Sequence, residues 1–119
     1  MHELLVTDDI SSENLETLLK ARENGEADFL LVDVREDMEY EMGHLKGVDM
    51  LKPTSDFQSW AQALLDESKD QVVIFTCRTG NRSGQVQNVF RSKSTTFITY
   101  LSISPRYETI PPEWLITLG

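Results

Sequence analysis

Cysteine, grouped histidines and long apolar runs are all scarce in this chain of 119 residues. Cys77 is the single cysteine and cannot form a disulfide within the chain, which favours a reducing compartment such as the cytoplasm. The two histidines, His2 and His44, are far apart, and no cysteine and histidine have the spacing of metal ligands. No stretch approaches the roughly 20 apolar residues of a membrane span, and the first residues lack the features of a secretory signal. We therefore expect that the protein binds no metal ion and does not associate with a membrane.

Basic residues are also few. The chain has 11 Lys and Arg against 20 Asp and Glu, a net charge of −9, which argues against nucleic acid as a partner. The charge is uneven, because residues 1–70 hold 18 acids and 6 bases while residues 71–119 hold 2 acids and 5 bases. No Asp or Glu occurs in residues 71–104. Cys77 therefore lies in the one long segment that carries no negative charge.

Strand and helix patterns alternate along the chain. Apolar and β-branched runs predict strands at 28–34, 48–51, 71–76 and 95–103. Capping residues and apolar stripes predict helices at 10–25, 55–68 and 83–92, with one short helical turn before Gly43. This alternation indicates an α/β domain with a mostly parallel sheet of about five strands flanked by helices. The aromatic and aliphatic stripe of the second helix predicts core residues Phe57, Trp60, Ala61, Leu64 and Leu65.

The stretch "VVIFTCRTGNRSG" places Cys77 where the clearest strand ends and a loop leads into a helix near Ser83. Ligands of open α/β sheets bind beyond the carboxyl ends of the strands. A helix N-terminus and the nearby Arg78 and Arg82 all favour a thiolate, and Gly80 lets the loop bend tightly around it. We expect a partly exposed nucleophile in a cradle of donors. The alternative is a buried cysteine that only fills space, but such a residue gains nothing from two adjacent cations.

Two motifs carry a resemblance to a known family. "CRTGNRSG" is similar to the active-site loop of single-domain rhodaneses, which are sulfurtransferases, and "LLVDVREDMEYEMGHLKGV" resembles the upstream signature of that family. They occur in the expected order and are separated by one helix. The resemblance covers roughly residues 10–90 and implies a single rhodanese-like domain over residues 1–119. Residues 91–119 depart from the family pattern, since they hold no glycine before Gly119 and two adjacent prolines disfavour a closing helix, although a last strand remains possible at 96–103.

The resemblance also implies roles for individual residues. Cys77 matches the nucleophile that carries sulfur as a persulfide. The surrounding substrate-binding loop matches Arg78, Thr79, Gly80, Asn81, Arg82 and Ser83. We interpret Asp33 and Arg35 as structural, with Asp33 accepting amide hydrogen bonds and Arg35 pairing with a carboxylate. We interpret His44 as a packed structural residue and the acids of "EDMEYE" as a solvated face.

The implied reaction is a two-step transfer. The Cys77 thiolate takes sulfur from a small anionic donor such as thiosulfate or polysulfide, and a thiol or cyanide acceptor then removes it. Neither a metal nor an organic cofactor is required.

Two other functions remain open. Some cysteine phosphatases share this fold and have a cysteine and an arginine at the ends of a loop, but their phosphate cradle needs five residues between the two. Here only four residues, 78–81, separate Cys77 from Arg82. The chain could also be a non-catalytic rhodanese-like interaction module, but such modules typically lose the cysteine.

Overall fold

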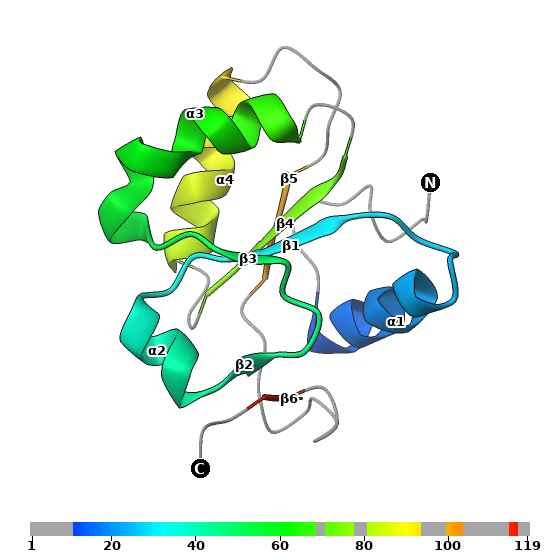
Figure 1. Cartoon of the computed structure of the whole chain (residues 1–119). Coiled ribbons are helices and arrows are strands. Elements are labelled where there is room, and N and C mark those ends of the chain that lie inside the picture. The colour runs from blue at the N-terminus through cyan, green and yellow to red at the C-terminus, as the bar shows by residue number, and fades with distance from the viewer. Residues whose placement is uncertain (1–10, 69–70, 78–80, 94–99, 104–114, 117–119) are drawn as a thin grey trace.

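The computed structural model describes residues 11–68, 71–77, 81–93, 100–103 and 115–116 (Figure 1). A 3₁₀ turn at Thr54–Asp56 leads directly into the third helix. The helices are α1 (Ser12–Glu23), α2 (Asp37–Met42), α3 (Phe57–Glu67) and α4 (Asn81–Lys93). The strands are β1 (Leu30–Asp33), β2 (His44–Leu45), β3 (Met50–Leu51), β4 (Val73–Thr76), β5 (Tyr100–Ile103) and β6 (Leu115–Ile116).

The main sheet is parallel and has the strand order β3-β1-β4-β5. Asp33 at the end of β1 is level with Leu51 of β3 and Thr76 of β4, so the carboxyl ends of these strands share one edge. The α/β class with a parallel sheet is confirmed. Within the described residues this sheet has four strands, where about five were expected.

Helices cover both faces of the sheet, as the alternation of buried side chains along its strands requires. Leu31 and Ile74 point to the face covered by α1, where they meet Leu15, Leu18 and Leu19. The residues that alternate with Leu31 and Ile74 along the chain belong to a second cluster, under α3 and α4 (Figure 1). Residues in and just after the two strands contribute Val32, Val34, Val73, Phe75 and Cys77, and the two helices contribute Trp60, Leu64, Val86 and Phe90.

The stripe predicted on the third helix is confirmed by the second cluster. Trp60 and Leu64 of α3 are buried, while Phe57, Ala61 and Leu65 are partly buried and pack against them. Phe90 of α4 meets this stripe and the sheet together, with ring centroids 5.1 Å from Phe75 and 6.1 Å from Trp60. The packing of Phe90 therefore anchors α4, the helix that follows the cysteine loop, near its carboxyl end.

The first helix has the predicted ends. The Ser11 hydroxyl caps α1 by accepting a hydrogen bond from the Asn14 N–H at 3.2 Å. After the helix, Gly25 adopts a φ of 77°, a conformation that glycine reaches without a steric cost. Gly25 and Glu26 then donate their N–H groups to the last carbonyls of α1, those of Arg22 and Ala21.

The last part of the chain confirms one expectation and adds an unpredicted pairing. β5 is parallel to β4, so the last strand expected at 96–103 exists, with its described part at Tyr100–Ile103. Strands β2 and β6 were not predicted and form a separate antiparallel pair, with His44 opposite Ile116. The prolines on which the doubt about a closing helix rested lie outside the described residues.

Candidate active site

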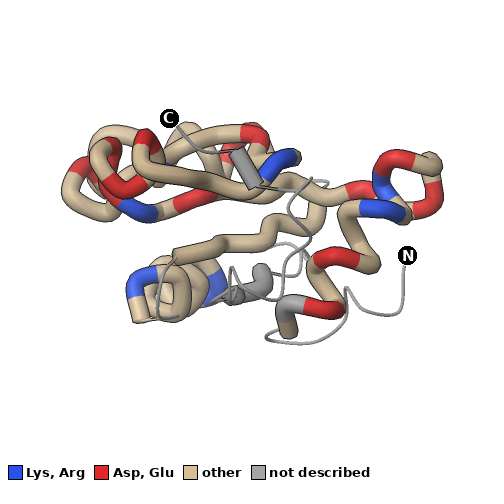
Figure 2. Tube along the Cα trace, turned by 90° about the horizontal axis from the view of Figure 1, so that it is seen from below, with Lys and Arg blue, Asp and Glu red and all other residues tan. Residues whose placement is uncertain are grey.

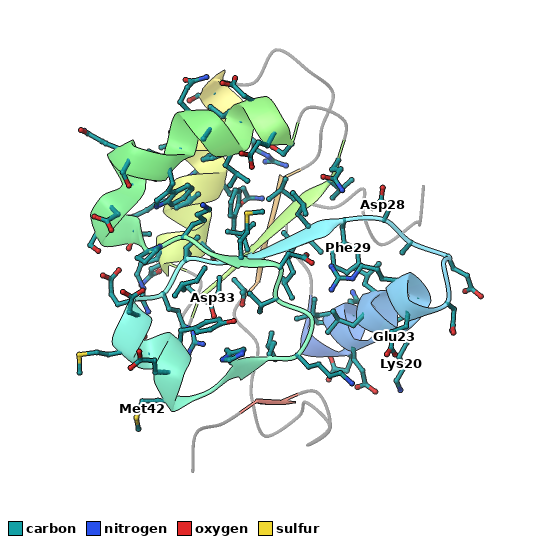
Figure 3. The ribbon with its side chains drawn as sticks, in the orientation of Figure 1. Lys20, Glu23, Asp28, Phe29, Asp33 and Met42 are labelled. Atoms are coloured by element: carbon teal, nitrogen blue, oxygen red, sulfur yellow. The ribbon has the colours of Figure 1, made fainter. Side chains whose placement is uncertain are left out.

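The site lies at the carboxyl edge of the sheet, between β1 and β4. The chain leaves β1 towards β3 on one side, and leaves β4 towards β5 on the other. Such a switch point is where open α/β sheets bind ligands, because the two connections diverge and leave room between them. The Val34 N–H donates to the Thr76 carbonyl at 3.0 Å and so prolongs the pairing of the two strands up to Cys77. Figure 3 shows Asp33 at this end of β1.

Cys77 is buried, with 1% of its surface exposed, whereas we had expected a partly exposed group. The physical reason is its place in the cluster under α3 and α4, which encloses the end of β4. Its sulfur accepts a hydrogen bond from the Ser83 N–H at 3.3 Å, and its thiol donates to the Ser83 hydroxyl at 3.3 Å. Ser83 lies in the first turn of α4 and is fully buried. The predicted approach of Cys77 to a helix N-terminus is thus confirmed.

Arg82 is paired with Glu39 of α2, from which it is separated by 43 residues. Its Nη1 donates to Glu39 Oε1 and its Nη2 donates to Glu39 Oε2 at 2.9 Å. The hydrogen bond from Arg82 lowers the pKa of Glu39 to about 2. The same bond is the main cause that raises the pKa of Arg82, and the Cys77 sulfur also contributes. One expectation is corrected, because Glu39 is not part of a solvated face but binds Arg82.

The carboxylate of Glu39 is held by its own helix as well. Its Oε1 accepts a hydrogen bond from the Glu36 N–H at 3.1 Å, which forms a capping box at the start of α2. Glu36 in turn accepts hydrogen bonds from the hydroxyl and N–H of Ser55. These contacts fix the position of α2 relative to the start of α3.

Asp33 and Arg35 form a buried ion pair with each other, which confirms their structural interpretation. The Asp33 carboxylate accepts from the Arg35 N–H at 2.9 Å and from the guanidinium at 2.9–3.1 Å. Arg35 also donates to the Gly43 carbonyl at 2.7 Å, beyond the end of α2. The pair therefore ties α2 to the carboxyl end of β1.

His44 is packed, as predicted. Its ring stacks on that of Tyr40, with centroids 3.7 Å apart, and its Nδ1 lies 3.0 Å from the Tyr40 carbonyl oxygen. Burial raises the pKa of Tyr40, and the nearby Asp33 adds to the effect.

The remaining loop residues are placed only in part. Asn81 begins α4 and is exposed. Arg78, Thr79 and Gly80 lie outside the described residues, so their expected contacts stay predictions. In the part of the chain that the structure describes, no cluster of His, Cys, Asp and Glu could hold a metal ion, and no helix is long and apolar enough to span a bilayer. Acidic residues recur along several segments of the trace, with basic residues between them (Figure 2).

A buried cysteine at the end of a parallel strand, facing the first turn of a helix, defines an α/β protein with a candidate site around that cysteine. The family model for the rhodanese-like domain matches residues 14–103, and the chain belongs to this family. A crystal structure of the Alr3790 protein from Anabaena sp. is similar, with a TM-score of 0.53 and 23% identity over 75% of this chain and 80% of that one. That likeness supports the fold alone. No curated protein matches.

Glu39 is the residue of this site that sequence reasoning missed. Two signals could have found it. Glu36 and Glu39 have the spacing of a capping box, which indicates a helix start rather than a plain acidic loop. The segments that follow β1 and β4 also had to meet at the same edge of the sheet. Arg82, in the segment after β4, has no acidic residue near it in the sequence, so the acids of the segment after β1 were candidate partners.

Proposed function

We propose that the protein is a sulfurtransferase that moves sulfane sulfur from thiosulfate or polysulfide to a thiol or cyanide acceptor through a persulfide on Cys77. The observation that carries the proposal is the contact of the Cys77 sulfur with the Ser83 N–H and hydroxyl at the start of α4. Free N–H groups of a first helical turn stabilise an anion, and a thiolate is the reactive form of cysteine.

The chemistry balances without a cofactor. The thiolate attacks the outer sulfur of thiosulfate, a sulfur–sulfur bond forms, and the bond within the donor breaks so that sulfite leaves with the electron pair. An acceptor then attacks the outer sulfur of the persulfide and regenerates the thiolate. The Ser83 N–H stabilises negative charge on the inner sulfur when the acceptor attacks. The Ser83 hydroxyl can turn to donate to the ionised sulfur, since a hydroxyl both donates and accepts.

The interaction module and the phosphatase remain the alternatives. The presence of Cys77 beside a helix N-terminus favours chemistry over a purely structural module. The engagement of Arg82 by Glu39 disfavours a phosphatase, because a phosphoryl dianion would have to compete with a carboxylate already bound to both guanidinium nitrogens. We also propose that the chain forms one domain and works in a reducing compartment such as the cytoplasm, which the single cysteine supports.

Intact-protein mass spectrometry tests the proposal. The protein is incubated with thiosulfate, weighed, treated with cyanide and weighed again, with thiocyanate measured in solution. We expect the addition of one sulfur atom that cyanide removes. Repetition with polysulfide distinguishes an unsuitable donor from an inactive protein. A chain that takes up sulfur from neither donor is not a sulfurtransferase of this kind.

A further inference from the structure

We propose that Glu39 is a positioning residue that acts on Cys77 through Arg82, by holding the guanidinium where it favours the thiolate. The inference rests on the proposed role of Cys77 as nucleophile. Its test measures the reactivity of the thiol rather than sulfur transfer, so the two proposals can fail separately.

The geometry of the ion pair provides the first argument. Two roughly parallel hydrogen bonds join the guanidinium of Arg82 to the carboxylate of Glu39, and about 30% of each side chain is exposed. A bidentate pair fixes the orientation of the guanidinium as well as its distance, which a single contact does not. With the pKa of Glu39 lowered to about 2 and that of Arg82 raised, both groups stay charged at neutral pH.

The place of Arg82 in the chain provides the second argument. It directly precedes Ser83, whose N–H and hydroxyl contact the Cys77 sulfur. Its hydrogen bond with Glu39 is the main cause that raises the pKa of Arg82, burial opposes this rise, and attraction to Cys77 adds to it. The guanidinium thus interacts with the carboxylate of Glu39 and, at longer range, with the nucleophile.

The rigidity of Glu39 provides the third argument. Its Oε1 is also bound by the Glu36 N–H, and Glu36 is bound by Ser55. The buried pair of Asp33 and Arg35 holds the far end of α2 at Gly43. A carboxylate fixed in this way can hold Arg82 in one position.

Two effects of Glu39 on the thiol oppose each other. The negative charge of Glu39, taken alone, disfavours a nearby thiolate. Its hold on Arg82, in contrast, keeps a positive charge at the residue that directly precedes Ser83, whose N–H and hydroxyl contact the sulfur. Replacement of Glu39 by glutamine removes the charge at nearly constant shape and weakens the hydrogen bonds that position Arg82. If charge alone mattered, Glu39→Gln would make the thiol more reactive. If positioning dominates, the same substitution makes it less reactive.

The experiment is alkylation of the full chain by iodoacetamide as a function of pH, which reports on Cys77 alone because no other cysteine exists. Glu41→Gln is the matched control, since it removes the same charge from an exposed position of the same helix. We expect Glu39→Gln to move the midpoint of the pH dependence of alkylation to higher pH by about half a unit, which corresponds to a fall of about threefold in the alkylation rate at neutral pH. Glu41→Gln should alkylate at nearly the rate of the wild type. Glu39→Asp should restore part of the rate.

Two results overturn the proposal: a Glu39→Gln variant that alkylates like Glu41→Gln, and one that alkylates faster than the wild type. If thermal unfolding shows that Glu39→Gln does not fold, Arg82→Lys replaces it, because lysine keeps the charge and loses the bidentate geometry. An unchanged rate in Arg82→Lys then contradicts the positioning role. A thiol that responds as expected but takes up no sulfur from either donor contradicts the proposed function and leaves the role of Glu39 intact.

Discussion

Ser83 contacts the Cys77 sulfur through both its N–H and its hydroxyl, each at 3.3 Å. Serine at this position offers two contacts to the sulfur, and alanine would keep only the contact of the N–H. Both residues are buried, so water cannot easily replace the lost contact. The relationship leads to a first prediction about the hydroxyl.

Ser83→Ala should lower the alkylation rate of Cys77 at neutral pH by about tenfold, since a hydrogen bond to a charged group contributes on the order of 1.5 kcal/mol. Ser92→Ala is the control, because Ser92 lies on the same helix, is exposed, and donates its hydroxyl to the Val89 carbonyl of that helix. Rates for the two variants are compared with the wild type under identical conditions. Equal rates in all three proteins would show that only the Ser83 N–H matters.

Cys77→Ala should abolish sulfur transfer and leave the fold intact. The side chain lies in the cluster under α3 and α4, so its truncation should cost about 1 kcal/mol of unfolding free energy. Thiocyanate formation and urea denaturation measure the two effects separately. Cys77→Ser serves as a second variant with a smaller change of shape. Turnover that persists in the alanine variant would rule out the persulfide mechanism.

Glu39 should make the stability of the protein depend on pH in the acid range. Its pKa in the folded protein is about 2 against an ordinary value of 4.5, so the ion pair stabilises the fold fully above about pH 4.5, and this contribution is lost as the pH falls through 2. Partial exposure limits the contribution to about 1 kcal/mol. Glu39→Gln should therefore be less stable than the wild type at pH 7 by that amount, and the difference should disappear as the pH falls below about 2. Urea denaturation at several pH values, with Glu41→Gln as control, measures the difference, and a gap that does not change with pH would contradict it.

Phe90→Ala should destabilise the protein by about 3–5 kcal/mol, because it opens a cavity under an aromatic group that contacts both the sheet and α3. Val89→Ala is the neighbouring control, at a half-buried position of the same helix. If the alanine variant does not fold, Phe90→Leu provides a milder truncation. Urea denaturation gives the comparison, and equal losses at the two positions would contradict the anchoring role of Phe90.

Much of the fold was predictable from local patterns. The run from Val73 to Thr76 is continuously apolar or β-branched because it is buried on both faces of a parallel sheet. The stripe from Phe57 to Leu65 has the helical period, and α1 has a capping serine. Each of these signals is contained within about a dozen residues.

The parts that escaped prediction depend on residues far apart in sequence. The two-residue strands β2 and β6 are too short for a periodic pattern, and each exists only through its pairing with the other. The partnership of Glu39 with Arg82 requires the strand order, which sequence alone did not provide. The burial of Cys77 arises in the same way, since α3 and α4 must first pack over the end of β4.

The two arginines beside Cys77 should differ in their kinetic effects. Arg82 is bound to Glu39 on one side and directly precedes Ser83 on the other, so Arg82→Ala should disturb the start of α4 and lower kcat. Arg78 directly follows Cys77, the proposed nucleophile, and we predict that it faces the incoming donor. Arg78→Ala should then raise KM for thiosulfate by about tenfold, or about 1.4 kcal/mol, with little change in kcat.

Steady-state kinetics of both variants at low and high salt distinguish these roles. Attraction of an anionic donor to Arg78 is strongest at low salt, where screening is weak, so the effect of Arg78→Ala on KM should shrink as salt is added. The effect of Arg82→Ala on kcat should persist at high salt, because the loss of a bidentate contact disturbs geometry as well as charge. An unchanged KM for Arg78→Ala at low salt would show that Arg78 does not contact the donor. A kcat of Arg82→Ala that recovers fully at high salt would show that Arg82 acts only through its charge.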